Sequence, residues 1–167
     1  MQDADLLTVF SELALGVAGF SGVIVALGQK QSAWQLLDKL RVSFLLFNAL
    51  IVVIFSLLPL GLASANMDTT YIWLYSSLLF VLMFAHMPFS FRIFVKSANK
   101  YDGFKSAKLH YLNMGIQIVA VVLLLLNVSY FREAWPHVLS LGLILLLTFI
   151  VFFELLIISM GQRGDSK

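Results

Sequence analysis

The chain has 167 residues, of which 60% are hydrophobic and only 12% are charged, and its mean hydropathy is +0.94. A soluble domain carries about a quarter charged residues, so this composition indicates an integral membrane protein. The net charge of +2 comes from basic residues in short segments between apolar runs, which is a pattern of membrane topology and argues against a nucleic-acid partner. The absence of cysteine excludes disulfides, thiolate nucleophiles and cysteine-ligated metal sites.

The first apolar run covers residues 6–27 and is the weakest of the predicted spans. Ser11, Glu12 and three glycines interrupt its apolar residues, so a re-entrant or interfacial segment is the alternative to a full span. If this run lines a pore, Glu12 forms an acidic ring that favours cations. The simpler interpretation of Glu12 is a side chain that reaches the outer membrane interface.

Small residues recur through the first run at helical spacing. Gly16, Gly19 and Gly22 are three residues apart, and Ala14, Ala18 and Gly22 are four apart. Small side chains let two helix backbones approach closely. The run is therefore predicted to form a packing surface, either within one protomer or between protomers that self-associate.

Four more apolar runs follow, and each has the roughly 20 mostly apolar residues that a spanning helix needs. They cover residues 42–62, 71–91, 111–131 and 138–160. A short interfacial helix over residues 32–41, "SAWQLLDKLR", is predicted ahead of them by its capping-box spacing. The sequence thus predicts an all-α integral membrane protein, a compact bundle of five transmembrane helices that forms one domain over residues 1–167.

Charge predicts the orientation of this bundle. Ten of the eleven Lys and Arg residues fall on one side of five spans, and only Arg132 falls on the other. The positive-inside rule places the N-terminus outside and the C-terminus in the cytoplasm of a bacterium, with the chain in the inner membrane. Tyr71, Trp73, Tyr75 and Trp135 are then expected in the aromatic belt at the outer interface.

A basic stripe follows the third run. Arg92, Lys96 and Lys100 recur every four residues and are expected to face the lipid headgroups. Such a stripe attracts anionic lipid by about 1 kcal/mol per cation near the surface. The alternative is a topology anchor whose side chains extend to the interface without selecting a lipid.

Polar residues inside the runs suggest a layer in the inner half of the bilayer. Counted from the cytoplasmic charges at about 1.5 Å per residue, Glu154, His86, Gln117 and Asn48 lie roughly 10 to 15 Å deep. An ionised carboxylate at that depth costs several kcal/mol unless it is paired or hydrated. Glu154 is therefore expected to handle an ion or proton together with His86 or Gln117, or else to make a structural hydrogen bond between helices or subunits.

The fourth span carries a polar stripe. Asn113, Gln117, Ala120 and Asn127 fall within about 40° of one line on a helical wheel. Unpaired amides are costly in lipid, so this stripe is predicted to face other helices. For Asn113 and Asn127 the expected role is hydrogen bonding between helices.

His86 lies two residues before Pro88, in the third run. A proline inside a helix frees the carbonyl four residues earlier, here that of Phe84. A free carbonyl beside an imidazole resembles part of a proton or cation path. The alternative is a neutral, hydrogen-bonded histidine beside an ordinary transmembrane proline.

The sequence contains no signature of a catalytic or cofactor site. Its three histidines fall at different predicted depths, which argues against a haem held by two of them. Motifs for zinc proteases, di-iron carboxylate sites, nucleotide phosphates and nucleophile-elbow serines are all missing. No cofactor or metal is expected, and enzymatic activity is not favoured.

Two classes of function remain. The first is a homo-oligomeric channel or transporter for a cation, a proton or a small solute, because so small a bundle has little room for a path of its own. The second is a non-catalytic accessory or assembly subunit that uses the first helix to dock a larger membrane protein. The ionisable residues in the predicted inner layer favour the first class.

Overall fold

The computed structural model describes residues 3–28, 36–84 and 104–161. These residues are helical apart from short turns, and no strand occurs among them. The expected all-α class is confirmed. The helices are α1 Ala4–Gly28, α2 Leu36–Ser64, α3 Thr69–Phe84, α5 Phe104–Leu126, the π-helical turn η1 Asn127–Phe131 and α6 Ala134–Gly161.

Within the described residues, four segments are long and apolar enough to cross a membrane, as expected for an integral membrane protein. They are Ala4–Ala26, Arg41–Ser64, Leu112–Phe131 and Ala134–Ile157. The third predicted run appears as the shorter apolar helix α3, which has 16 described residues, and residues 85–91 of that run lie outside the described part of the chain.

Two helices differ in detail from the sequence-based expectation. α1 is one continuous helix of 25 residues, without the break that a re-entrant segment would need. Residues 36–41, expected to belong to a separate interfacial helix, are the first turns of α2 and continue directly into its apolar part.

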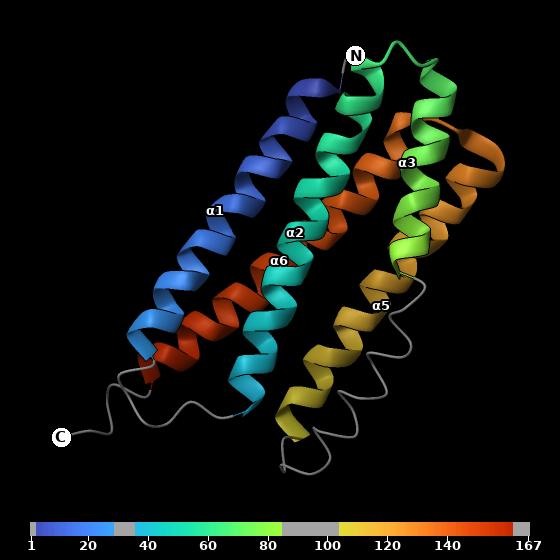
Figure 1. Ribbon diagram of the computed structural model, residues 1–167. Helices are drawn as coiled ribbons and strands as arrows, with labels where there is room; N and C mark the ends of the chain where they lie inside the picture. The colour runs from blue at the N-terminus through green and yellow to red at the C-terminus, as the bar shows by residue number, and fades with distance from the viewer. Residues whose placement is uncertain (1–2, 29–35, 85–103, 162–167) are drawn as a thin grey trace.

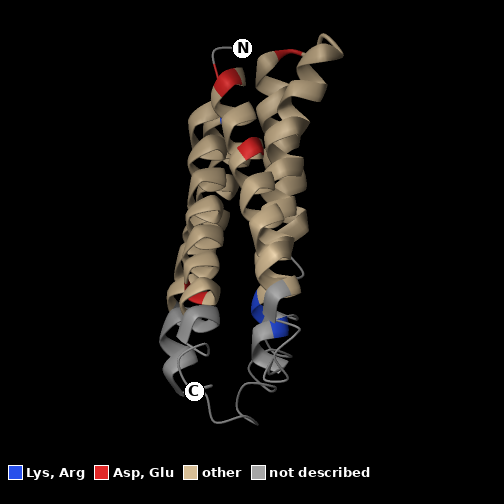
Figure 2. Ribbon diagram, turned by 90° about the vertical axis from the view of Figure 1, so that its left-hand side faces the viewer, with Lys and Arg blue, Asp and Glu red and all other residues tan. Residues whose placement is uncertain are grey.

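α6 lies in the middle of the bundle (Figure 1). It contacts α1 and α2 on one side and α5 and α3 on the other. α1 and α2 also pack along each other, as do α3 and α5. The start of α1 and the end of α6 lie at opposite ends of the bundle (Figure 1). In Figure 2, long stretches of uncharged helix separate the charged positions near these two ends.

The core is a layer of apolar side chains between these helices. The rings of Phe55 on α2 and Phe80 on α3 stack with centroids 4.3 Å apart, and Leu124 and Leu141 are fully buried beside them. In a membrane the lipid is as apolar as these side chains, so close packing and hydrogen bonds between helices hold such a bundle together. The polar contacts inside it therefore carry much of its specificity.

Three of the four aromatic residues expected at the outer interface are exposed. Tyr71 and Tyr75 stack on each other on the surface of α3, and Trp135 packs edge-on against Phe131. Trp73 differs, because it is 2% exposed and its ring lies 5.7 Å from that of His137. Successive residues of a helix point in different directions, so Trp73 faces the core while its neighbours face outward.

Candidate functional site

Glu154 forms an ion pair inside the bundle. Its Oε1 atom lies 3.1 Å from Nη2 of Arg41, at the start of the apolar part of α2. Both side chains are mostly covered, with 18% of Arg41 and 25% of Glu154 exposed. The guanidinium offsets the cost of placing a carboxylate in an apolar helix, and its planar fork suits a carboxylate well.

This ion pair changes the predicted depth of Glu154. Asn48 lies seven residues, or roughly 10 Å, from Arg41 along α2. Glu154 is paired with Arg41, at the start of the apolar part of α2, and so it does not share a layer with Asn48. Arg41 is the partner that sequence reasoning missed, because it was taken only as a charge marking the membrane edge.

The polar stripe of the fourth span faces the bundle, as predicted. Asn113, Gln117 and Asn127 are buried, and so is Ala120 between them. The hydroxyl of Ser140 on α6 donates a hydrogen bond of 3.2 Å to the carbonyl oxygen of Ala120, which aligns α5 with α6.

Hydrogen bonds between helices place Asn48 relative to α6. On α2, Asn48 lies midway between Arg41, which is paired with Glu154, and Phe55, which is bonded to His137. The corresponding midpoint on α6 falls near residues 145–146. Asn48 itself has no exposed surface.

The same alignment brings the α5 amides to the level of Asn48. Since Ser140 of α6 is level with Ala120 of α5, a point five residues further along α6 is level with Gly115. Asn113 and Gln117 lie on either side of Gly115. Asn48 and Gln117, two members of the predicted layer, are thus at a similar height, and we call Asn48, Asn113 and Gln117 the amide layer.

Several polar atoms of the interior have no hydrogen-bond partner in the described structure. In the amide layer these are both amide atoms of Asn48, Oδ1 of Asn113 and Nε2 of Gln117. The hydroxyls of Ser56 and Ser76 are also buried without a partner. Most buried polar groups in proteins are bonded, so these atoms need an explanation.

His137 satisfies a carbonyl that a proline leaves free. Pro59 lies inside α2 and has no N–H to donate to Phe55 four residues earlier. Nε2 of His137 on α6 lies 3.0 Å from that carbonyl oxygen. Because a carbonyl only accepts, Nε2 is the protonated nitrogen and donates this bond.

A chain of hydrogen bonds continues from the other ring nitrogen. The Ser77 hydroxyl lies 3.2 Å from Nδ1 of His137 and accepts a bond of 2.8 Å from the side-chain amide of Asn127. The Asn127 side chain also bonds the backbone N–H and carbonyl of Glu133, both at 3.0 Å. This network ties α2, α3, η1 and α6 together.

The network also shapes the connection between α5 and α6. η1 ends at Arg132, which has a left-handed backbone (φ 54°) and donates its N–H to the carbonyl of Asn127. The role of Asn127 in bonding between helices, predicted from its place on the stripe, is confirmed, whereas His137 was not singled out. The signal that would have found His137 is Pro59, which requires a hydrogen-bond donor from another helix.

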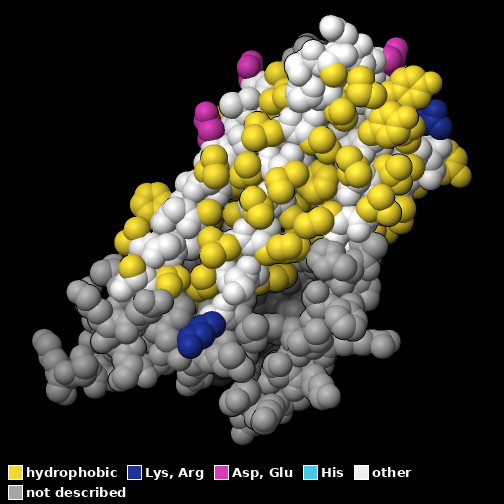
Figure 3. Space-filling model, viewed as in Figure 1, with side chains coloured by type: hydrophobic (Ala, Val, Ile, Leu, Met, Phe, Trp, Pro, Cys, Tyr) yellow, Lys and Arg dark blue, Asp and Glu magenta, His cyan; other side chains and the backbone are white. Residues whose placement is uncertain are grey.

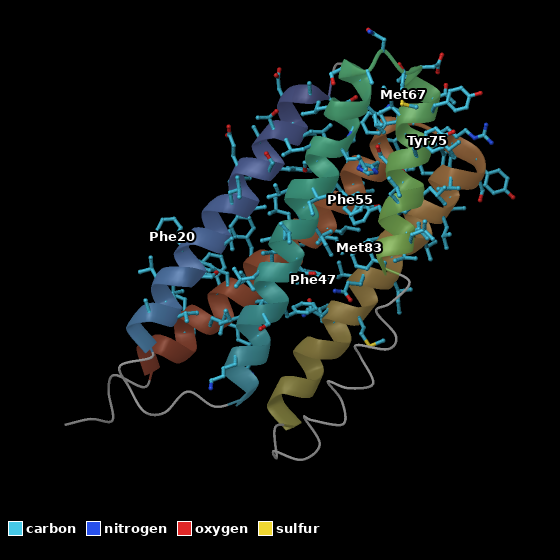
Figure 4. The ribbon with its side chains drawn as sticks, viewed as in Figure 1. Phe20, Phe47, Phe55, Met67, Tyr75 and Met83 are labelled. Carbon is cyan, nitrogen blue, oxygen red and sulfur yellow. The ribbon has the colours of Figure 1, made fainter. Side chains whose placement is uncertain are left out.

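Glu12 and the glycines of α1 face away from the bundle. Leu7, Ala14 and Ser21 form the buried face of α1, whereas Glu12, Gly16, Gly19 and Val23 lie on the opposite, exposed face. We call these last four residues the outer face of α1. Beside this face, Phe20 also points outward from α1 (Figure 4).

Three glycines of α1 do not pack against the described residues of the protomer. A Cβ atom added at Gly16, Gly19 or Gly22 would meet nothing within 4 Å. Gly142 on α6, in contrast, lies against α1, where an added Cβ would be 3.7 Å from the ring of Phe10. Of the small residues predicted to pack, Ala14 is buried and Ala18 is half-buried.

Comparisons with protein-family models, with curated proteins and with solved structures find no match. The function is therefore argued from the residues of this chain and their surroundings.

Four residues of the predicted sites lie outside the described residues. They are His86 and the basic stripe of Arg92, Lys96 and Lys100. The proposed pairing of Glu154 with His86 stays a prediction for the same reason.

The chemistry available in the described part of the chain is limited to binding and pairing. No group of three or more His, Asp or Glu residues there is placed to hold a metal ion. Ser77 and His137 form a serine–histidine pair, but both are fully buried, so a substrate cannot reach the hydroxyl. Glu12, in contrast, is exposed on the apolar surface of the bundle and has no partner in the described structure.

Proposed function

We propose that the protein is a homo-oligomeric channel or transporter that passes a cation across the inner membrane of a bacterium. In this proposal the chain crosses the membrane five times, with its N-terminus outside and its C-terminus in the cytoplasm. The alternating directions of α1, α2, α3, α5 and α6 along the bundle support five spans.

The observation that carries the proposal is the position of Glu12. It lies on the outer face of α1, eight residues after the helix begins at Ala4, or roughly 12 Å along it. Figure 3 shows acidic side chains standing out from the edge of the molecule over α1, beside a broad apolar surface. A carboxylate facing lipid at that position is costly, so another molecule or water must cover it.

Close association of several α1 helices would cover it. Gly16 and Gly19 on the same face would let these helices approach. The Glu12 carboxylates would then meet around one axis and form an acidic ring, which attracts cations and repels anions. This arrangement places the path between protomers.

The interior of one protomer offers less support for a path. Aromatic rings fill the space between α2 and α3, as Figure 4 shows around Phe55. Glu154, at first a candidate for ion handling, is held by Arg41, and His137 is held by Phe55 and Ser77. Ionisable side chains that already have partners are poor carriers for a passing ion.

The test is cation flux into liposomes that contain the purified protein. Glu12→Gln keeps the size and hydrogen-bonding capacity of the side chain and removes its charge. We expect this variant to form the same oligomer but to lose most of its cation flux. The matched control is Glu133→Gln, which changes an exposed acid in the turn between η1 and α6, away from α1, and should leave flux unchanged. Equal flux through wild type and Glu12→Gln would contradict the proposal.

The same face also supports the accessory-subunit alternative. The outer face of α1 presents an acid and small residues but no basic side chain, so a second copy of α1 brings no counter-charge to Glu12. A transmembrane helix of another protein with a cationic or amide donor would bring one. The mass of the protein in mild detergent separates the two candidates, because a monomer favours the accessory subunit and a closed ring favours the channel.

A further inference from the structure

The amide layer is separate from the outer face of α1, and its buried polar atoms need hydrogen-bond partners. It contains unpartnered donors, on Nδ2 of Asn48 and Nε2 of Gln117, and unpartnered acceptors, on Oδ1 of Asn48 and Asn113. The three side chains are 0%, 8% and 7% exposed for Asn48, Gln117 and Asn113, respectively. They come from two helices, α2 and α5, and lie in one half of the apolar segments, with Asn48 seven residues from Arg41, and Gln117 and Asn113 five residues and one residue from Leu112.

Leaving these groups without partners is expensive. A buried polar group without a hydrogen bond costs about 1 to 3 kcal/mol, and lipid supplies no replacement partner. The same bundle shows the alternative in Asn127, whose amide bonds Ser77 and the backbone of Glu133. The contrast with Asn127 indicates that the amide layer has a partner other than the described side chains.

We propose that the amide layer binds water in the interior of the membrane. A water molecule both donates and accepts, and in protein interiors it makes about three hydrogen bonds to otherwise unsatisfied groups. The amide layer presents this mixture of donors and acceptors and carries no charge.

The chemistry of the layer argues against a bound cation. A desolvated cation such as Ca²⁺ or Mg²⁺ takes about six or more oxygen ligands, whereas the layer has two buried unpartnered oxygens, on Asn48 and Asn113. Its two free N–H₂ groups would repel a cation, but they suit the oxygen of water.

The difference in burial within the layer indicates its accessible side. Asn48 is fully enclosed, while Gln117 and Asn113 keep a small exposed surface on α5. Water therefore reaches the layer from the α5 side. The terminal torsion angles of Asn and Gln side chains have broad energy minima, so small rotations of these amides admit a water molecule without moving the helices.

Water-edited solid-state NMR of the full chain in lipid vesicles tests the proposal directly. Magnetisation transferred from water to side-chain ¹⁵N is expected to appear at Asn48 Nδ2 and Gln117 Nε2. The internal control is Asn127 Nδ2, which is fully bonded within the protein and should receive little. Asn48→Leu and Gln117→Leu assign the signals by removing one each. Transfer at Asn127 but not at Asn48 or Gln117 would overturn the proposal, as would a shift of the layer signals on titration with Na⁺ or K⁺.

The midpoint of thermal unfolding of Asn48→Leu gives a second, independent test, because a dry layer and a hydrated layer predict shifts of opposite sign. If the layer is dry, Asn48→Leu removes unpaired polar atoms and should raise the midpoint of thermal unfolding. If it binds water, the same change removes the hydrogen bonds between Asn48 and the water, and should lower that midpoint by several degrees. Asn127→Leu is the control that lowers the midpoint in either case. A more stable Asn48→Leu protein would contradict bound water.

Discussion

Glu154 and Glu12 are both carboxylates in apolar helices, and their surroundings differ completely. Glu154 lies 3.1 Å from the guanidinium of Arg41, between α6 and α2. Glu12 is exposed on α1 and has no such partner in the described part of the chain. Because Glu154 is paired within the protomer, we expect it to contribute to stability. Because Glu12 is exposed, we expect it to contact a molecule outside the protomer.

The Arg41–Glu154 pair is expected to be worth about 1 to 2 kcal/mol, between the values of exposed and fully buried ion pairs. Glu154→Gln and Arg41→Gln should each lower the midpoint of thermal unfolding in detergent, because each leaves one charge without its partner. The double variant should cost less than the sum of the two single variants. If the two effects are simply additive, the pair does not stabilise the fold.

Pro59 and His137 are coupled in the same way, through the carbonyl of Phe55. His137→Leu should destabilise the bundle by about 1 to 3 kcal/mol, because it leaves that carbonyl and Ser77 without a partner. Pro59→Ala restores a backbone N–H that can bond the carbonyl within α2. In the Pro59→Ala background, His137→Leu should therefore cost less. The same cost in both backgrounds would show that the proline is not the reason for this bond.

The partners of single residues were only partly predictable from the sequence. The stripe of Asn113, Gln117 and Asn127 was correctly placed in the interior, because helical periodicity alone decides which residues share a face. The partner of Glu154 was not, because depth was counted along each helix from its own charges. Long side chains such as that of Arg41 extend from one helix to another, so positions along single helices do not predict their contacts.

At the scale of the helix, α1 shows that the rotation of a helix about its own axis decides which neighbour a small-residue motif faces. Its glycine and alanine pattern predicted close packing, but the pattern does not say against which neighbour. In the structure Ala14 faces the bundle and Gly16, Gly19 and Gly22 are exposed. The glycines therefore do not pack against the described residues of their own protomer.

A pair of glycine variants separates folding from assembly. Gly142→Leu should destabilise the protomer, because the added side chain meets the ring of Phe10, whereas Gly142→Ala should be tolerated at a contact of 3.7 Å. A Cβ atom at Gly19 meets no described atom of its own protomer within 4 Å, so Gly19→Leu should leave thermal stability nearly unchanged and should disrupt the oligomer. Thermal unfolding and mass in detergent provide the two measurements. If Gly19→Leu unfolds the protomer, this face is needed for folding and does not act in assembly alone.

The helices themselves were the most predictable part of the fold. Within the described residues, each apolar run gave a helix at the expected place, and the third run is described only as far as Phe84. The reason is that lipid requires roughly 20 apolar residues with all backbone groups bonded internally. The π-helical turn at Asn127–Phe131 was not predicted. It is accompanied by side-chain bonds from Asn127 to the backbone of Glu133, six residues later, and such bonds leave no trace in hydropathy.

For the whole molecule, the sidedness of the membrane is the next property to measure. A reporter fused after Lys167 is expected to be active in the cytoplasm, and a tag before Met1 is expected to be accessible from outside. The expectation follows from the position of ten of the eleven basic residues on one side of five spans. Finding both ends on the same side would mean that one of the five helices does not cross.

The central position of α6 has a consequence for the order of events during synthesis. α6 is the last of the described helices to leave the ribosome, yet it contacts α1, α2, α3 and α5 and supplies Glu154 and His137. Until it arrives, the guanidinium of Arg41 and the carbonyl of Phe55 have no partner from α6. The contacts of α1 with α2 and of α3 with α5 can form before α6 arrives, whereas the contacts that join these two pairs through α6 form only afterwards. The bundle is therefore completed late, when its central helix α6 packs against the helices that precede it.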